Sequence, residues 1–284
     1  GARLGLWHTT AAGMPFVGPA LRGRIVPVFD RAGVDGYVGW GRQFPARLGR
    51  WCALIHRRPF WTLEDGLLRS VGLGKSGEPP ISVIADDLGI HFDARTPSRI
   101  ERIALEADLA AHAPRAARLR EAVLGHRLSK YNHLPDRPVA LPPPSGRRLL
   151  LIDQVRGDYS IVGACAGASS FAAMLDAALA VPGAEVVIRG HPDVLAGYAR
   201  GYLSEMAAGR GLSVLADAVA PHAVLDAVDE VWTVSSQMGF DALMRALPVR
   251  CFGVPFYAGY GLTRDTPATA AARAALVRRA GRRL

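Results

Sequence analysis

Two adjacent carboxylates follow an apolar stretch in WTLEDGLLRSVGLG, residues 61–74, which has the pattern of a buried strand and a turn. Neighbouring side chains on a strand point to opposite faces, so Glu64 and Asp65 are expected to have different roles. A carboxylate at a strand end can take a proton from an attacking hydroxyl, and Arg69 can neutralise an acid or a substrate carboxylate. The alternative is a strand-end turn with solvated acids.

His191 and Pro192 follow another strand-like run, in VIRGHPDV, residues 187–194. Proline suits the first turn of a helix, and a histidine at that point can direct a ring N–H toward an anion. The alternative is a histidine that merely caps a loop between strand and helix.

Ser235, Ser236 and Gly239 repeat this arrangement in VWTVSSQMGFDALMRA, residues 231–246. Hydroxyl groups and helix N–H groups together can bind phosphate, and glycine allows a close approach. A simple serine N-cap is the alternative. Because parallel strands end at one edge of a sheet, the two motifs predict a shared phosphate site.

Asp153 and Asp158 belong to LIDQVRGDYSI, residues 151–161. Asp153 comes at a predicted strand end, where backbone N–H groups are expected to hold it. Asp158 follows Gly157 and is expected to project from the loop or to cap the next turn.

The first half has short apolar runs typical of buried parallel strands, then a hairpin and a helix. Ser98 and Glu101 have the spacing of a capping box at the start of that helix. The predicted strands are residues 3–7, 24–29, 36–40 and 60–64, the hairpin is residues 82–93, and the helix runs from residue 98 to about 124.

The segment LPDRPVALPPPSGRR, residues 134–148, contains five prolines and predicts a linker. It separates an acceptor-side domain, residues 1–140, from a nucleotide-sugar domain, residues 141–284. In the second domain, predicted strands alternate with predicted helices. The strands are residues 148–153, 185–190, 212–216, 230–234 and 249–253, and the helices lie near residues 167–180, 194–208, 221–227 and 237–246.

Alternation of strand and helix predicts a doubly wound parallel sheet whose ligands bind at the carboxyl ends of the strands. The predicted fold class is therefore α/β and GT-B-like, with two Rossmann-like domains and an interdomain cleft.

The 284-residue chain carries 34 basic and 25 acidic residues, a formal charge of +9, and all but two of the basic residues are arginines. This charge suits an anionic substrate or membrane surface. Nucleic acid is not expected, because aromatic residues do not alternate with the basic ones. The last arginines, Arg278, Arg279, Arg282 and Arg283, are a candidate membrane-facing cluster.

No apolar run reaches the length of a membrane span. The three cysteines are far apart in the sequence, which favours a reducing cytoplasm.

Seven motifs in consistent order resemble the capsule polysaccharide biosynthesis and export proteins of the KpsC/LipA type, a family that contains retaining β-Kdo glycosyltransferases. Kdo is 3-deoxy-D-manno-oct-2-ulosonic acid. The motifs span residues 4 to about 265, and their DQ and CFG versions favour a single module of the C-terminal type. They are EDGLLRSVGLG, PPISVIADDLGIHFDARTPS, SKYN, DQVRGDYSI, HPDV, SSQMGFDAL and CFGVPFYAGYGLTRD.

The resemblance implies double displacement with net retention. His191, Ser235 and Ser236 would surround the phosphate of CMP-β-Kdo, and Glu64 or Asp65 would deprotonate the acceptor hydroxyl. The nucleophile would be Asp158 or Asp153, with Asp158 favoured. The motifs also imply substrate contacts from residues that the resemblance alone supplies: Gln154, Tyr257 and Gly259. No cofactor and no obligatory metal is expected.

The implied partners are CMP-Kdo, a Kdo-oligosaccharide or lysophospholipid-linked acceptor, a second transferase module and the inner membrane surface. The expected location is the cytoplasm, at the periphery of the inner membrane. Two departures, Val155 for threonine and Tyr260 for tryptophan, concern the acceptor or the linkage. The alternatives are another GT-B-like enzyme, such as a CDP-polyol phosphotransferase, and a non-catalytic capsule-export scaffold.

Overall fold

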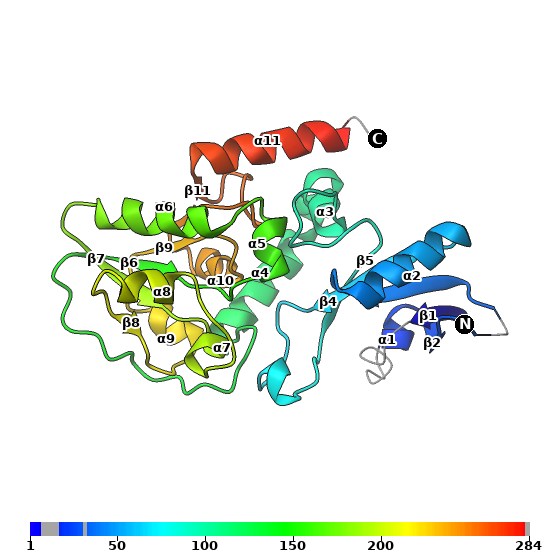
Figure 1. The fold of residues 1–284 in the computed structure, drawn as a ribbon, viewed down its shortest axis with the longest axis horizontal. Helices are drawn as coiled ribbons and strands as arrows, with labels where there is room; N and C mark the ends of the chain where they lie inside the picture. Colours follow the sequence, from blue (N-terminus) through cyan, green and yellow to red (C-terminus); the bar gives the residue numbers. More distant parts are fainter. Residues whose placement is uncertain (7–16, 31–32, 282–284) are drawn as a thin grey trace. The chain divides into compact units, whose positions relative to one another are not determined.

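A computed structural model describes residues 1–6, 17–30 and 33–281 (Figure 1). The chain forms two compact units. The first comprises residues 1–91 and 96–107, and the second comprises residues 92–95 and 108–284. Trp7, expected at the end of the first strand, lies outside the described residues.

The first unit is built on a five-stranded sheet in the order β2-β1-β3-β4-β5. The first four strands are parallel, and β5 is an antiparallel edge strand. Its elements are β1 (Ala2–Leu6), α1 (Val17–Ala20), β2 (Gly23–Pro27), β3 (Gly36–Trp40), α2 (Phe44–Ile55), β4 (Phe60–Asp65), the 3₁₀ turn η1 (Gly74–Ser76), β5 (Val83–Asp86) and α3 (Arg99–Glu106).

The prediction of a hairpin at residues 82–93 is wrong, because its first strand pairs with a different partner. β5 pairs with β4, where Glu64 lies opposite Ile84, rather than with the residues that follow it. The chain turns after β5 because Asp86 Oδ1 accepts hydrogen bonds from the N–H groups of Leu88 and Gly89, at 2.9 and 2.8 Å.

The single helix expected from residue 98 is two helices, α3 and α4 (Leu109–Gly125). The Ser98 cap is confirmed, because its hydroxyl accepts from the N–H of Glu101. Ala107 is extended, with ψ of 151°, and Asp108 caps α4 by accepting from the N–H groups of Ala110 and Ala111. The interruption coincides with the division between the two units.

The second unit has a six-stranded, fully parallel sheet in the order β8-β7-β6-β9-β10-β11. Numbered within this unit, the order is 3-2-1-4-5-6, the Rossmann order, and the doubly wound parallel sheet predicted for this half is confirmed. Its strands are β6 (Arg147–Ile152), β7 (Ala184–Arg189), β8 (Val214–Leu215), β9 (Glu230–Thr233), β10 (Val249–Cys251) and β11 (Arg264–Asp265).

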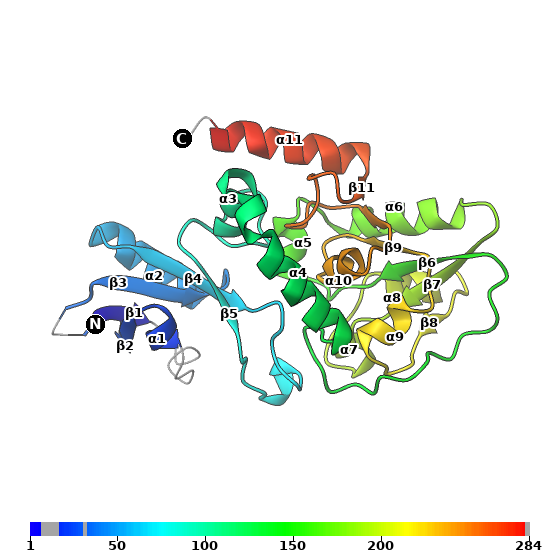
Figure 2. The same cartoon turned by 180° about the vertical axis from the view of Figure 1, so that it is seen from behind.

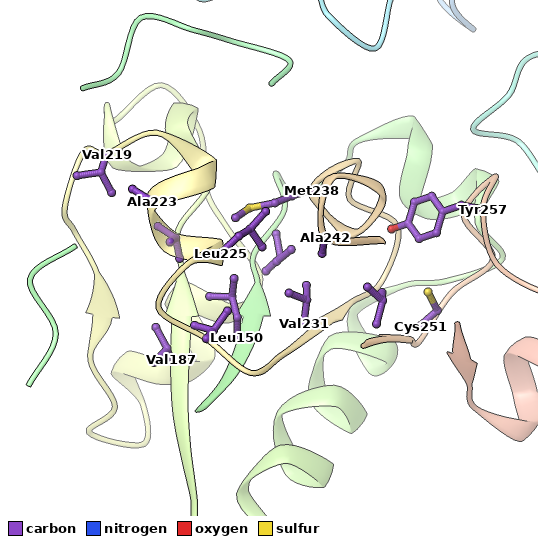
Figure 3. Close-up of a cluster of buried hydrophobic side chains, with 14 of the residues drawn as sticks. Leu150, Val187, Val219, Ala223, Leu225, Val231, Met238, Ala242, Cys251 and Tyr257 are labelled. Carbon is purple, nitrogen blue, oxygen red and sulfur yellow. The ribbon is translucent and has the colours of Figure 1, made fainter. Parts of the chain in front are cut away.

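Helices cover both faces of this sheet (Figures 1 and 2). On one face, α5 (Tyr159–Gly163), α6 (Ala168–Leu179) and α8 (Leu203–Ala208) enclose a core around Phe171 and Trp232. On the other, α9 (Pro221–Leu225) and α10 (Met238–Met244) enclose a core in which Val219 and Tyr257 lie at opposite ends (Figure 3). The remaining helices are α7 (Pro192–Leu195) and α11 (Pro267–Gly281).

The proline-rich segment does not divide the domains, so the boundary predicted at residues 140 and 141 is corrected. The segment packs on the second unit: Val139 and Leu141 contact its core, and Arg137 pairs with Asp217. The Pro135 carbonyl accepts a hydrogen bond from the N–H of Ala220. Prolines here keep the chain extended along a surface, which is compatible with packing.

Helix α4 belongs to the second unit because its side chains and C-terminal end bind there. Arg120 Nε donates to the Met244 carbonyl at 2.6 Å, and His222 Nε2 lies 2.6 Å from the Leu128 carbonyl oxygen.

Sequence patterns predicted neither α5, β11 nor α11. Of the arginine cluster, Arg282 and Arg283 lie outside the described residues, and the side chains of Arg278 and Arg279 are not described. None of the helices in the described ranges is both long and apolar enough to cross a membrane.

Candidate active site

The centre of the candidate site is the gap between the ends of β6 and β9, where the strand order of the second unit reverses. Ligands of doubly wound sheets bind at such a point. Here the Gln154 side chain joins the two strand ends, because its Nε2 donates to Ser235 Oγ and its Oε1 accepts from the Ser235 N–H, both at 2.9 Å. Gln154 therefore positions the Ser235 hydroxyl.

A pocket of about 100 Å³, partly open to solvent, adjoins this point. It lies at the carboxyl ends of β6 and β7 and at the start of α10, entirely within the second unit. Several predicted site residues line it, namely Asp153, His191, Pro192 and Ser236. Residues of the HPDV and SSQMGFDAL motifs therefore meet at the carboxyl ends of the strands, where the sequence predicted.

Asp153 lines the pocket but is held by its own fold. Its carboxylate accepts hydrogen bonds from the backbone N–H groups of Gln154, Tyr202, Leu203 and Ser204 and from the Ser204 hydroxyl, at 2.6–2.9 Å. Only 1% of the residue is exposed. The expectation that backbone groups hold this side chain is confirmed, and its lone pairs are occupied.

Asp158 differs from Asp153 in each of these respects. It is exposed, it caps α5 by accepting one hydrogen bond from the Ser160 N–H at 2.8 Å, and it is not among the residues that line the pocket. Gly157 before it has φ of +78°, a left-handed conformation that favours glycine. The carboxylate therefore keeps lone pairs that no backbone group occupies.

His191 combines a capping role with a place in the pocket. Its Nδ1 accepts a hydrogen bond from the Asp193 N–H at 3.1 Å, at the start of α7. An accepting Nδ1 assigns the ring proton of the neutral imidazole to Nε2, which is then a donor. Pro192 occupies the first turn of α7, as predicted.

The loop before α10 differs from the predicted phosphate loop in one respect. Its backbone N–H groups are used internally: Ser236 N–H donates to Thr233 Oγ1, Met238 N–H to Ser236 Oγ, and Gly239 N–H to the Ser236 carbonyl. An anion in this loop would therefore meet hydroxyl groups rather than these N–H groups, which corrects the expected use of free helix N–H groups.

Tyr257 and Gly259 do not line the pocket. Tyr257 is 3% exposed, and its hydroxyl donates to the Ser236 carbonyl at 2.5 Å, so it supports the loop from behind. Burial raises the pKa of Tyr257. Gly239 is required beside it, because a Cβ there would lie 2.2 Å from Tyr257 Oη. Gly259 has φ of +84° and shapes a turn against Arg273.

Two basic residues in the pocket wall were not assigned roles from the sequence, Arg189 and Lys130. Arg189 ends β7, is 5% exposed and donates through Nη2 to the Val219 carbonyl at 2.9 Å. Among the described residues, its buried Nη1 has no hydrogen-bond partner. Burial lowers the pKa of Arg189 to about 10. A buried guanidinium with an unused donor attracts an anion.

Asp241 is a third polar residue that lines the pocket and was not assigned a role from the sequence. It is 4% exposed, in the first turn of α10. Burial raises its pKa to about 7, against the opposing effect of the Lys130 ammonium group. Lys130 belongs to the SKYN motif and Asp241 to the SSQMGFDAL motif. Membership of these motifs was the sequence signal that could have identified both residues as part of the site.

The carboxylate pair of the first unit lies at the end of β4, as expected. Asp65 forms an ion pair with Arg69, with 2.9 Å between its Oδ1 and Arg69 Nε, and both side chains are largely buried. Arg69 also donates to the Glu78 carbonyl at 2.8 Å. Glu64 Oε1 instead accepts from the N–H of Asp65. The two acids therefore have different surroundings, and Arg69 neutralises an acid of the protein.

A family model described as capsule polysaccharide biosynthesis protein matches residues 36–140 and again 139–283. The chain belongs to this family. The resemblance found in the motifs, to proteins of the KpsC/LipA type, is thereby confirmed.

Curated members of the capsule family are similar over most of the chain. The capsule polysaccharide modification protein LipA of Neisseria meningitidis serogroup A is 42% identical over 243 residues, which are 83% of this chain and 34% of LipA. The lipopolysaccharide-processing protein LpsZ of Rhizobium meliloti is 37% identical over 240 residues, or 54% of LpsZ. The chain thus spans about a third of LipA and half of LpsZ.

Solved structures support the same architecture. A Thermosulfurimonas dismutans structure titled KpsC, beta Kdo 2,4 transferase, is 36% identical with a TM-score of 0.85, covering 96% of this chain and 89% of that one. A second, titled KpsC, beta Kdo 2,7 transferase, shares the fold at 24% identity, with a TM-score of 0.65 over 93% of this chain and 83% of that one. The fold is α/β and GT-B-like, with two parallel-sheet domains, as predicted.

Proposed function

We propose that this protein is a retaining β-Kdo glycosyltransferase of capsule synthesis. It transfers Kdo from CMP-β-Kdo to a Kdo-terminated, lipid-linked acceptor. The observation that carries the proposal is the agreement over nearly the whole chain with a structure titled a beta Kdo 2,4 transferase. The pocket at the switch point supports it, because its buried arginine, lysine and histidine suit an anionic nucleotide sugar.

CMP-Kdo carries two anionic groups, the phosphate and the C1 carboxylate of the sugar. Ser235, Ser236 and His191 supply hydroxyl and ring N–H donors for the phosphate. Lys130 and Arg189 line the same pocket and add positive charge close to it. Because these groups neutralise the leaving phosphate, we expect no obligatory metal.

The nucleophile in this proposal is Asp158. Its carboxylate attacks the anomeric carbon of Kdo, the bond from that carbon to the phosphate oxygen breaks, and CMP departs with the bonding electrons. An acceptor hydroxyl, deprotonated by Glu64 or Asp65, then forms the new glycosidic bond and displaces the carboxylate. Two inversions give net retention. The saturated hydrogen bonding of Asp153 supports Asp158 over it.

Nucleotide selectivity gives the first test. CMP is expected to raise the thermal midpoint of the protein, since a ligand of the native state stabilises it by mass action, whereas UMP and AMP have little effect. His191→Ala weakens the CMP effect without unfolding the protein. Equal stabilisation by CDP-glycerol contradicts the Kdo assignment and favours a polyol phosphotransferase.

The second test is turnover with CMP-Kdo and short Kdo acceptors, in the presence and absence of EDTA. We expect transfer in both, with a β-2,4 linkage by NMR, and a Kdo adduct on the Asp158 peptide by mass spectrometry. Asp158→Ala abolishes transfer and retains CMP binding. An adduct on Asp153 contradicts the choice of nucleophile, and no transfer under any condition favours a non-catalytic scaffold.

A further inference from the structure

Helix α2 of the first unit packs on its sheet through small side chains. Ala46, Gly49 and Ala53 are its buried residues. The approach is close, because a Cβ on Gly39 of β3 would lie 2.7 Å from both Cα and Cβ of Ala46. The face of α2 that meets the sheet therefore has no room for large side chains.

The large apolar side chains of α2 lie on its outer face. Phe44, Trp51 and Ile55 are 68%, 69% and 62% exposed, and Leu54 beside them is 76% exposed. With 3.6 residues per turn, Phe44, Trp51 and Ile55 lie within about 40° of one another around the helix axis. They are opposite the buried residues, so the usual arrangement of a surface helix is reversed.

The segment of the chain that contains α2 is positively charged. Residues 36–63 contain no aspartate or glutamate and include five arginines. Arg47, Arg50, Arg57 and Arg58 of this set are exposed. Arg57 has φ of +52° and follows the C-cap residue His56, so it leaves the helix in a new direction.

We propose that the outer face of α2 docks the protein on an anionic lipid bilayer. Phe44, Trp51 and Ile55 enter the boundary between headgroups and acyl chains, and the arginines contact lipid phosphates. Exposed aromatic and aliphatic side chains, in a segment of the chain that has arginines and no acidic residues, fit a bilayer better than a protein surface of mixed charge. The inference does not depend on Kdo transfer.

Vesicle sedimentation of the whole protein tests the proposal. We expect binding to vesicles of phosphatidylcholine and phosphatidylglycerol in equal parts, and at least tenfold weaker binding to pure phosphatidylcholine. Trp51→Ser with Ile55→Ser lowers the affinity for the anionic vesicles tenfold or more. The matched control is Leu109→Ser with Leu119→Ser on α4, where both leucines are 56% exposed, and it leaves binding unchanged.

A second arm tests the charges. Arg57→Glu with Arg58→Glu weakens binding at low salt by tenfold or more, with thermal unfolding used to show that each variant is folded. Equal binding by the Trp51/Ile55 variant and the wild type overturns the proposal, as does a lack of binding to anionic vesicles. If the same variant instead dissociates an oligomer, the face is a protein interface and the proposal is wrong. Because the readout is lipid binding, its failure is distinct from a failure of the transferase assignment.

Discussion

Asp153 and Asp158 are five residues apart, yet the fold uses them in opposite ways. The strand end at β6 places Asp153 under the N–H groups that begin α8, and the left-handed Gly157 carries Asp158 out to solvent. Sequence reasoning anticipated this difference, because a strand end and a glycine are local signals. It could not identify the donors, which come from residues about 50 positions further along the chain.

Replacing each aspartate by asparagine is expected to change the free energy of unfolding by different amounts. Asp153→Asn places an amide N–H₂ against backbone donors, so the free energy of unfolding falls by roughly 3 kcal/mol or more. Asp158→Asn affects one exposed cap and costs about 1 kcal/mol or less. Urea unfolding measures both. A similar loss in the two variants contradicts the structural role assigned to Asp153.

Asp241 is expected to make stability depend on pH. Its folded pKa is about 7 and its ordinary value is 3.8, so between these values the native state retains a proton that the unfolded state has lost. The free energy of unfolding therefore falls as pH rises from about 4 to 7. Asp241→Asn removes this fall and gains roughly 2–4 kcal/mol relative to wild type between pH 5 and pH 8.

Urea unfolding at pH 5 and pH 8 checks this difference between variant and wild type. The matched control is Asp176→Asn, at an exposed carboxylate paired with Arg210, which keeps the wild-type dependence in this range. The same pH dependence in Asp241→Asn and wild type rules out a protonated Asp241 in the native state.

At the scale of elements, strands β6 to β10 of the second unit were predictable because each is a short, largely apolar run between turn residues. Strand β11 was not, because Arg264 and Asp265 give no apolar signal. The errors were of a different kind. The pairing of β5 with β4 depends on contacts between residues distant in sequence, and the division of the 98–124 helix follows the division of the chain into two units. Sequence patterns report which segments are apolar, but they do not report which segments meet.

The start of α10 is expected to be the element least tolerant of added volume. In Gly239→Ala the new methyl group overlaps Tyr257 Oη and shifts the hydroxyl that binds the Ser236 carbonyl. We expect a loss of about 1–3 kcal/mol in unfolding free energy and weaker CMP binding. Urea unfolding and calorimetry measure the two effects.

Gly125→Ala is the matched control for Gly239→Ala. Gly125 is the last residue of α4, and no atom lies within 4 Å of the position that its Cβ would take. Alanine is therefore expected to leave stability unchanged or to raise it by up to about 1 kcal/mol. Equal effects at the two glycines contradict the packing described at α10.

At the scale of the whole molecule, the division of the chain predicts which fragment folds. A fragment of residues 92–284 contains the complete second unit and is expected to unfold cooperatively in urea. A fragment of residues 141–284 lacks α4 and the residues up to 140 that follow it. Arg120 and Leu128 in this missing part bind α10 and α9, and Val139 packs on the core. We expect this shorter fragment to lack cooperative unfolding and near-ultraviolet circular dichroism. Cooperative unfolding of the shorter fragment restores the boundary at residue 140.

The order of the strands in the second sheet also sets a limit on folding time. β6 is made first but lies at the centre, and its partner β9 is 81 residues further along, where Leu149 lies opposite Glu230. Pairings so distant in sequence form slowly, because the entropy cost of closing a long loop comes before the strand contacts can stabilise the pair. During synthesis, Gln154 therefore has no Ser235 to bind until that residue is made, and the proposed nucleotide-sugar site is incomplete in any nascent chain that ends before that serine.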